Sequence, residues 1–125
     1  MIKYFYDNET EILETTISGK TTVNDLLDYI STLQKDKSLP EKLKILTDAS
    51  NGNLSEDVEP EDLHLVVEAN NKILAAKEFI YDAFILSSSL ETAMGQLYKE
   101  FSKANNYRFN IFSTKEAAIR WLNSF

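Results

Sequence analysis

Few residues in this chain have the types and spacing that catalysis needs. His64 is the only histidine, cysteine is absent, and the three glycines stand far apart. Hydrolysis by an activated hydroxyl needs a general base beside the nucleophile, and a phosphate loop needs closely spaced glycines. His64 stands one residue from an apolar helical stripe, which favours a surface or boundary position. The sequence therefore predicts a protein that is not an enzyme and that carries no cofactor.

Acidic side chains gather in one segment, at Glu56, Asp57, Glu59, Glu61 and Asp62. Such a cluster offers oxygen ligands to a hard cation such as Ca²⁺, but the spacing lacks the alternation and the turn glycine of an EF-hand. Acidic residues before a helix are also stabilised by the partial positive charge of the helix N-terminus. We therefore predict a structural role for these acids and no metal site.

Asp82 is the one acid within an apolar stretch, residues 79–86, which reads F-I-Y-D-A-F-I-L. Burying a carboxylate is costly unless it is paired. Asp82 is therefore expected either to face a polar edge or to meet Lys72, Lys77 or Arg108, and a structural ion pair is favoured over a catalytic acid. The serines at positions 87–89 could present hydroxyls to an anion, but a helix N-cap is the favoured role.

The elements that position these residues follow from periodicity and capping. The stretch 79–86 is apolar at nearly every position, which is typical of a strand buried on both faces and predicts the centre of a parallel sheet. Further strands are expected at 2–6, 11–18, 43–47 and 108–112, with Gly19-Lys20 ending the second. Helices are expected after capping boxes at Thr22/Asp25, Ser88/Glu91 and Ser113/Glu116, and after Pro60.

The resulting order is β-β-α-β-α-β-α-β-α, in a single α/β domain over residues 1–125. Strands that alternate with helices imply right-handed crossovers, so we expect a mostly parallel five-stranded sheet flanked by four helices, with an opening hairpin as an antiparallel edge. Ligands and partners of such sheets meet the loops at the carboxyl ends of the strands. Those loops are predicted at 19–22, 48–59 and 87–89.

Charge and hydropathy exclude some partners. The net charge is −7, and fourteen acids face six bases in residues 1–62, against six acids and seven bases in residues 63–125. This sign disfavours nucleic acid, whose binding begins with neutralisation of phosphates. No apolar run approaches the ~20 residues of a membrane span. The absence of cysteine fits a reducing compartment, and we expect a cytoplasmic protein.

Three segments resemble the STAS-like group, the fold of bacterial anti-sigma-factor antagonists. They are K-I-L-T-D-A-S at residues 44–50, A-F-I-L-S-S at residues 83–88 with Tyr98 in the helix that follows, and F-S-T-K-E-A-A-I-R-W-L at residues 112–122. The last is similar to the F-x-[ST/D]-x-E-E-A-x-x-W-L ending of small bacterial STAS-like proteins. The resemblance implies this fold over nearly the whole chain.

The resemblance also implies a regulatory module that binds a protein partner through the loop and helix after the third strand. The candidate partner-binding residues are Asp48, Ser50, Asn51, Asn53, Leu54 and Ser55, with Leu54 as the apolar anchor. Antagonists of this family carry a phosphorylated serine in a D-S-S-G-like turn, which is missing here. A phosphate on Ser55 would meet Glu56 and Asp57, so like-charge repulsion opposes such a switch.

The alternative function is binding of a small, apolar or lipid-like molecule, since STAS-like domains resemble lipid-binding relatives. Aromatic and methionine side chains at core spacing could line a pocket between the sheet and the helices. The candidates are Phe84, Met94, Tyr98 and Trp121. An unfilled cavity at these residues would favour this function, and a filled core would count against it.

Overall fold

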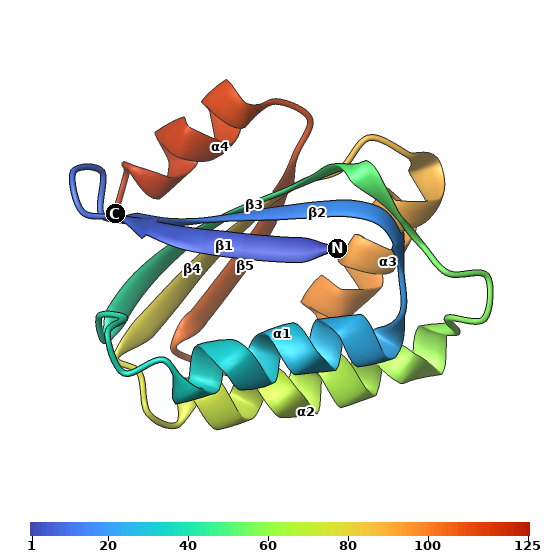
Figure 1. Ribbon diagram of the computed structural model, residues 1–125, viewed down its shortest axis with the longest axis horizontal. Helices are drawn as coiled ribbons and strands as arrows, with labels where there is room; N and C mark the ends of the chain where they lie inside the picture. Colours follow the sequence, from blue (N-terminus) through green and yellow to red (C-terminus); the bar gives the residue numbers. More distant parts are fainter.

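The computed structural model describes residues 1–125 and contains the predicted elements in the predicted order (Figure 1). The strands are β1 Ile2–Asp7, β2 Ile12–Thr21, β3 Lys42–Leu54, β4 Phe79–Ile85 and β5 Tyr107–Phe112. The helices are α1 Val23–Lys35, α2 Leu63–Leu74, α3 Ser89–Phe101 and α4 Lys115–Leu122, with a 3₁₀ turn at Pro60–Asp62 before α2. The predicted α/β fold class is confirmed.

The five strands form one sheet in the order β1-β2-β3-β4-β5. The β1–β2 hairpin is antiparallel and every other neighbouring pair is parallel, as expected. The central strand is β3, so the prediction that residues 79–86 form the centre of the sheet was wrong. β4 nevertheless has buried residues on both faces, because helices cover both sides of the sheet at this position.

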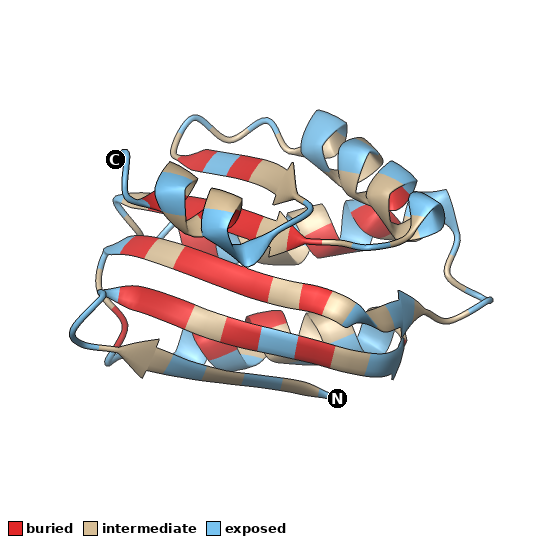
Figure 2. Ribbon diagram, turned by 90° about the horizontal axis from the view of Figure 1, so that it is seen from above, coloured by how far each residue is buried: buried red, intermediate tan, exposed pale blue.

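The helices divide unequally between the two faces of the sheet. Each parallel crossover steps to the next strand in the same direction, and the right-handed rule then places α1, α2 and α3 on one face. Helix α4 follows the last strand and returns over the opposite face (Figure 1). Two apolar clusters result, the larger beneath α1–α3 and the smaller beneath α4. Their residues run as buried stripes along the middle strands in Figure 2.

Strands β2 and β3 both continue beyond their predicted ends. Gly19 does not end β2, since with φ +74° it stays within a strand that reaches Thr21. After a bulge between Thr16 and Ser18, four further pairs join β2 to β3, from Ser18 with Asn51 to Thr21 with Leu54. Residues 49–54, predicted as a loop, are therefore strand. Main-chain pairing holds this segment, although its Ser, Asn and Gly residues have low strand propensity.

Two of the three predicted helix caps are confirmed. The Thr22 hydroxyl accepts from the Asp25 N–H at 3.1 Å and the Asp25 carboxylate accepts from the Thr22 N–H at 2.9 Å. The Ser88 hydroxyl accepts from the Glu91 N–H, so the serine run does cap α3. The third cap is Thr114, one residue after the predicted Ser113.

Candidate functional site

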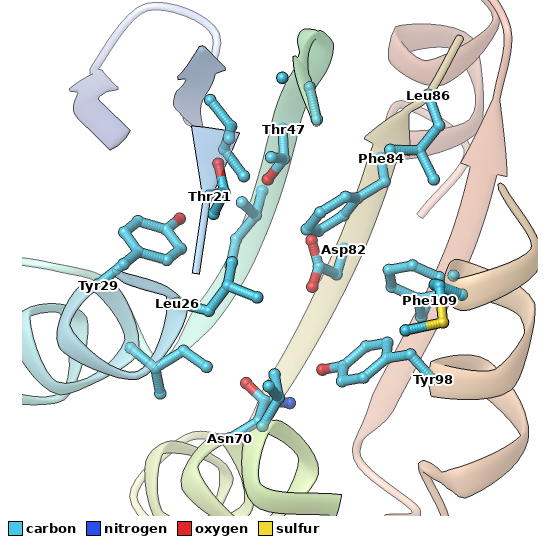
Figure 3. Close-up of a pocket in the computed structure, with 18 of the residues that line it drawn as sticks. Thr21, Leu26, Tyr29, Thr47, Asn70, Asp82, Phe84, Leu86, Tyr98 and Phe109 are labelled. Carbon is cyan, nitrogen blue, oxygen red and sulfur yellow. The ribbon is translucent and has the colours of Figure 1, made fainter. Parts of the chain in front are cut away.

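A cavity of about 140 Å³ lies between the sheet and helices α1–α3. Of the 26 residues that line it, 18 are hydrophobic, and they come from β2, β3, β4, β5 and the three helices (Figure 3). Ala49 and Gly52 on β3 and Gly95 on α3 all belong to the lining.

Three of the four predicted pocket residues line this cavity. Phe84 comes from β4, and Met94 and Tyr98 come from α3. Figure 3 shows Phe84 and Tyr98 in the cavity wall. Trp121 does not line the cavity, because α4 covers the other face of the sheet. Its ring lies 5.6 Å from that of Phe112 and 5.0 Å from that of Phe125, between ring centroids.

A chain of hydroxyl groups leads to a buried carboxylate in the cavity wall. The Tyr107 hydroxyl donates to Asp82 Oδ2 at 2.6 Å, and the hydroxyls of Tyr98 and Tyr107 lie 2.9 Å apart. Because Tyr107 gives its only hydroxyl proton to Asp82, Tyr98 is the donor in the second bond. Both donors thus point toward the carboxylate, an arrangement that favours its ionised form.

Burial dominates the protonation of Asp82, which is only 8% exposed. Loss of solvation raises the pKa of Asp82 from 3.8 to about 7, and the hydrogen bond from Tyr107 acts in the opposite direction. Burial also raises the pKa of Tyr107 well above its ordinary value, and the charge of Asp82 adds to this shift.

The ion pair expected for Asp82 is absent, so that prediction was wrong. Lys77 instead donates to the carbonyl oxygens of Leu39 and Pro40, at 3.1 and 2.9 Å. The Arg108 guanidinium lies over the Phe125 ring, 5.5 Å from its centroid, and Lys72 is exposed. Asp82 forms no ion pair with these residues because its side chain lies on the face of the sheet beneath α1–α3.

Two buried oxygens in the cavity wall have no hydrogen-bond partner. They are Asp82 Oδ1 and the hydroxyl of Thr47, a residue that is 0% exposed. Ile45 is the register partner of Asp82, so Thr47 stands two residues further along β3 on the same face (Figure 3). Buried polar groups in folded proteins are nearly always bonded, and unbonded ones at a cavity are candidates for contact with a ligand.

The other polar groups of the lining are placed differently. On the α1 side, the hydroxyl of Tyr29 lies 2.6 Å from Thr15 Oγ1, and burial raises the pKa of Tyr29. Thr21 from β2, Asn53 from β3, Asn70 from α2 and Glu91 from α3 complete the polar lining. No lysine, arginine or histidine lines the cavity.

The residues predicted to bind a partner lie along the second half of β3, with Ser55 directly after its end. Asp48 Oδ1 accepts from the N–H and the hydroxyl of Ser50, at 3.0 and 2.6 Å. Asn53 and Leu54 line the cavity, and Asn51 is exposed. The Ser55 hydroxyl donates to Asp57 at 2.5 Å, beyond the end of β3.

Of the two unbonded groups, only Asp82 is marked by a signal in the sequence. Asp82 was notable as an acid within an apolar strand, although its partner was predicted wrongly. Thr47 carries no such signal, because threonine is common in strands and its burial depends on the sheet register.

The structure holds no group of three or more side chains that could bind a metal ion. None of its helices has the length and apolar character to cross a membrane.

Comparison with known proteins relates the chain to one solved fold. No protein-family model and no curated protein matches it. An uncharacterised protein of the DUF3478 family from Shewanella loihica PV-4, which has a SpoIIAA-like fold, superimposes with a TM-score of 0.60 at 19% identity. The match covers 98% of this chain and 92% of the other. The chain therefore has a SpoIIAA-like fold, that of the anti-sigma-factor antagonists, as its STAS-like resemblance predicted.

Proposed function

We propose that the protein is a non-enzymatic binding module that takes up a small, mostly apolar molecule in the cavity between the sheet and α1–α3. The observation that carries this proposal is the cavity itself, about 140 Å³ with mainly hydrophobic walls. An apolar cavity of about 150 Å³ is large enough to bind benzene. A protein core is normally packed without such voids, and leaving one open lowers stability.

The position of the cavity supports the same function. Its lining includes the exposed Asn53 and the half-buried Leu54, Leu86 and Glu91, so it extends toward the surface at the carboxyl ends of β3 and β4. Ligands of open α/β sheets bind at this end. A small molecule therefore has a short path into the cavity.

The side chains around the cavity support binding rather than catalysis. Catalytic hydrolysis by a serine or threonine needs a base within hydrogen-bonding distance. His64 stacks on Phe101 with ring centroids 4.1 Å apart and does not line the cavity. The acids of the lining, Asp82 and Glu91, have no histidine or lysine beside them in the wall.

Regulatory protein–protein interaction through the segment after β3 is the alternative that the STAS-like resemblance favours. That function needs an apolar anchor on the surface. Leu54, the residue expected in this role, lines the cavity instead. The geometry therefore supports a small ligand better than a protein partner.

Filling the cavity tests the proposal. We expect toluene to give saturable shifts in the NMR spectrum of the wild type, centred on residues of the cavity wall. Ala49→Leu, which adds three carbon atoms to a buried lining residue, is expected to weaken toluene binding at least about tenfold by removing contact volume. The matched control is Ala93→Leu, because Ala93 is exposed and outside the lining. It should leave the affinity unchanged.

Two outcomes would contradict the proposal. One is a wild type that shows no saturable binding of toluene, which would leave the protein-partner alternative in place. The other is an Ala49→Leu variant that binds toluene as tightly as the wild type. If Ala49→Leu does not fold, Val66→Phe fills the cavity from the α2 side instead and should weaken toluene binding in the same way.

A further inference from the structure

Resting on the proposed function, we propose that the cavity selects an amphipathic amine, with an apolar body among the hydrophobic walls. Its protonated amino group would donate hydrogen bonds to Asp82 Oδ1 and to the hydroxyl of Thr47. Four observations carry this inference: the two unbonded oxygens, the direction of the tyrosine hydroxyls, the charge of the lining, and the aromatic rings around it.

The unbonded oxygens define what the head group must supply. Asp82 Oδ1 and Thr47 Oγ1 are both buried and both lack a partner, and the two residues that carry them belong to the cavity lining. A carboxylate oxygen only accepts, so the missing partner of Asp82 is a donor. An ammonium group has three donors and no acceptor, so one such group carries enough donors for both oxygens.

The tyrosine hydroxyls satisfy the other oxygen of this carboxylate, Oδ2. Tyr107 donates to Oδ2, and Tyr98 donates to Tyr107 in turn. These two neutral donors stabilise the negative charge but do not balance it. No basic side chain of the protein does so either, because the cavity wall contains no lysine, arginine or histidine. A buried carboxyl group without a counter-charge is held partly protonated at neutral pH, and a cationic ligand would supply the charge that stabilises its ionised form.

The charge of the lining also excludes the opposite class of ligand. Its ionisable acids are Asp82 and Glu91, and it has no cation to receive a carboxylate or a phosphate head. The rings of Tyr29, Phe84, Tyr98 and Phe109 stand around the cavity (Figure 3). Their faces attract cations and repel anions.

The protonation of Asp82 gives the binding a pH dependence. Its pKa of about 7 in the empty cavity would fall when an ammonium group binds beside it, so binding at neutral pH releases part of a proton. The titratable groups that interact with Asp82 are Tyr29 from α1, Tyr98 from α3 and Tyr107 from β5. Glu91 from α3 and the uncharged Asn70 from α2 also line the cavity. None is cationic, so affinity should rise from pH 6 to pH 8.

The size of the cavity selects the probe. A volume near 140 Å³ suits a body of about one benzene ring. Benzylamine, benzyl alcohol and benzoate share this ring and differ in the head, which is a cation, a neutral donor and an anion respectively.

The experiment is calorimetric titration of the full chain at pH 8 and pH 6 with the three probes. At pH 8 we expect benzylamine to bind at least about tenfold more tightly than benzyl alcohol, since hydrogen bonds to charged groups are the strong ones. Benzoate should not bind. Asp82→Asn should weaken benzylamine about tenfold or more and leave benzyl alcohol within about twofold. Thr47→Val, an isosteric change, should weaken benzylamine about threefold.

Four results would overturn the inference. The first is benzyl alcohol binding as tightly as benzylamine, which would leave the proposed function standing without the amine. The second is an Asp82→Asn variant that keeps its preference for benzylamine. The third is loss of that preference in Glu91→Gln but not in Asp82→Asn. That result would place the amine beside Glu91, where the cavity extends toward the surface. If no probe binds while toluene does, only the inference fails, and if toluene fails too the proposed function fails with it.

Discussion

Replacing Asp82 with asparagine is expected to raise the free energy of unfolding at pH 8 by about 2–4 kcal/mol. The folded-state pKa of about 7 lies roughly three units above 3.8, and each unit corresponds to about 1.4 kcal/mol. This difference is the cost of holding the charge in the interior at high pH, and asparagine removes it. The amide keeps an oxygen for the Tyr107 hydroxyl and turns its N–H groups toward the cavity.

The sign of the effect follows from proton linkage. The folded protein holds the Asp82 proton more tightly than the unfolded chain does, so the contribution of Asp82 to stability is greatest below pH 4. It falls as the pH rises from 4 through 7, and it stays low above that range. The Asp82→Asn variant does not lose stability in this way, because it has no carboxyl group at this position. Wild type and variant should therefore have similar stability at pH 4 and diverge progressively up to pH 8.

Urea unfolding of both proteins at pH 4, 6 and 8 measures this divergence. Asp28→Asn is the matched control, because Asp28 is exposed on α1 and its neutralisation should change the profile little. Parallel profiles of wild type and Asp82→Asn would show that the Asp82 carboxyl is not in the environment described here. The same variant is used in the ligand experiment, so its stability also establishes that it is folded there.

The second large effect is expected at the opposite face of the sheet. Leu122→Ala should lower the free energy of unfolding by about 3 kcal/mol, as deletion of a fully buried leucine does. Leu122 is 0% exposed and packs in the smaller cluster with Leu46, Tyr81, Ala83 and Ala118. Helix α4 alone covers this cluster, so no neighbouring helix can close the space that the change leaves.

Thermal and urea unfolding of Leu122→Ala, beside Leu90→Ala, give the measurement. Leu90 is 63% exposed, and its truncation should cost less than about 0.5 kcal/mol. Because α4 and the cavity lie on different faces of the sheet, toluene affinity of folded Leu122→Ala should stay within about twofold of the wild type. A large loss of toluene affinity would mean that the two clusters are coupled through the sheet.

The order of the elements could be predicted from the sequence because it depends on local signals. Apolar runs, capping residues such as Thr22 and Ser88, and the proline before α2 act within a few residues. The extension of β2 and β3 could not be predicted, since Gly19, Asn51 and Asn53 have low strand propensity. Pairing between two distant segments across a bulge outweighs that preference.

The candidate site could be predicted only in part, for the same reason. Met94 and Tyr98 share one face of α3 by their spacing of four residues, and the structure places them with Phe84 of β4 around one cavity. Which face α4 covers is not set by periodicity, so the position of Trp121 could not be derived. The partner of Asp82 depends on the register of β4 against β5, which brings the Tyr107 hydroxyl within reach.

The extension of β3 beyond Asp48 leaves part of the sheet with an open side. Pairing with β4 stops at Asp48 and Ile85, while β3 continues to Leu54 beside β2 alone. The Ser87 hydroxyl donates to the Ser50 carbonyl oxygen at 2.9 Å and occupies one backbone group there. An unpaired strand edge of this kind is where other chains add and aggregation begins. Serine, asparagine and glycine in this segment lower its strand propensity, which disfavours addition of another strand at the rim of the cavity.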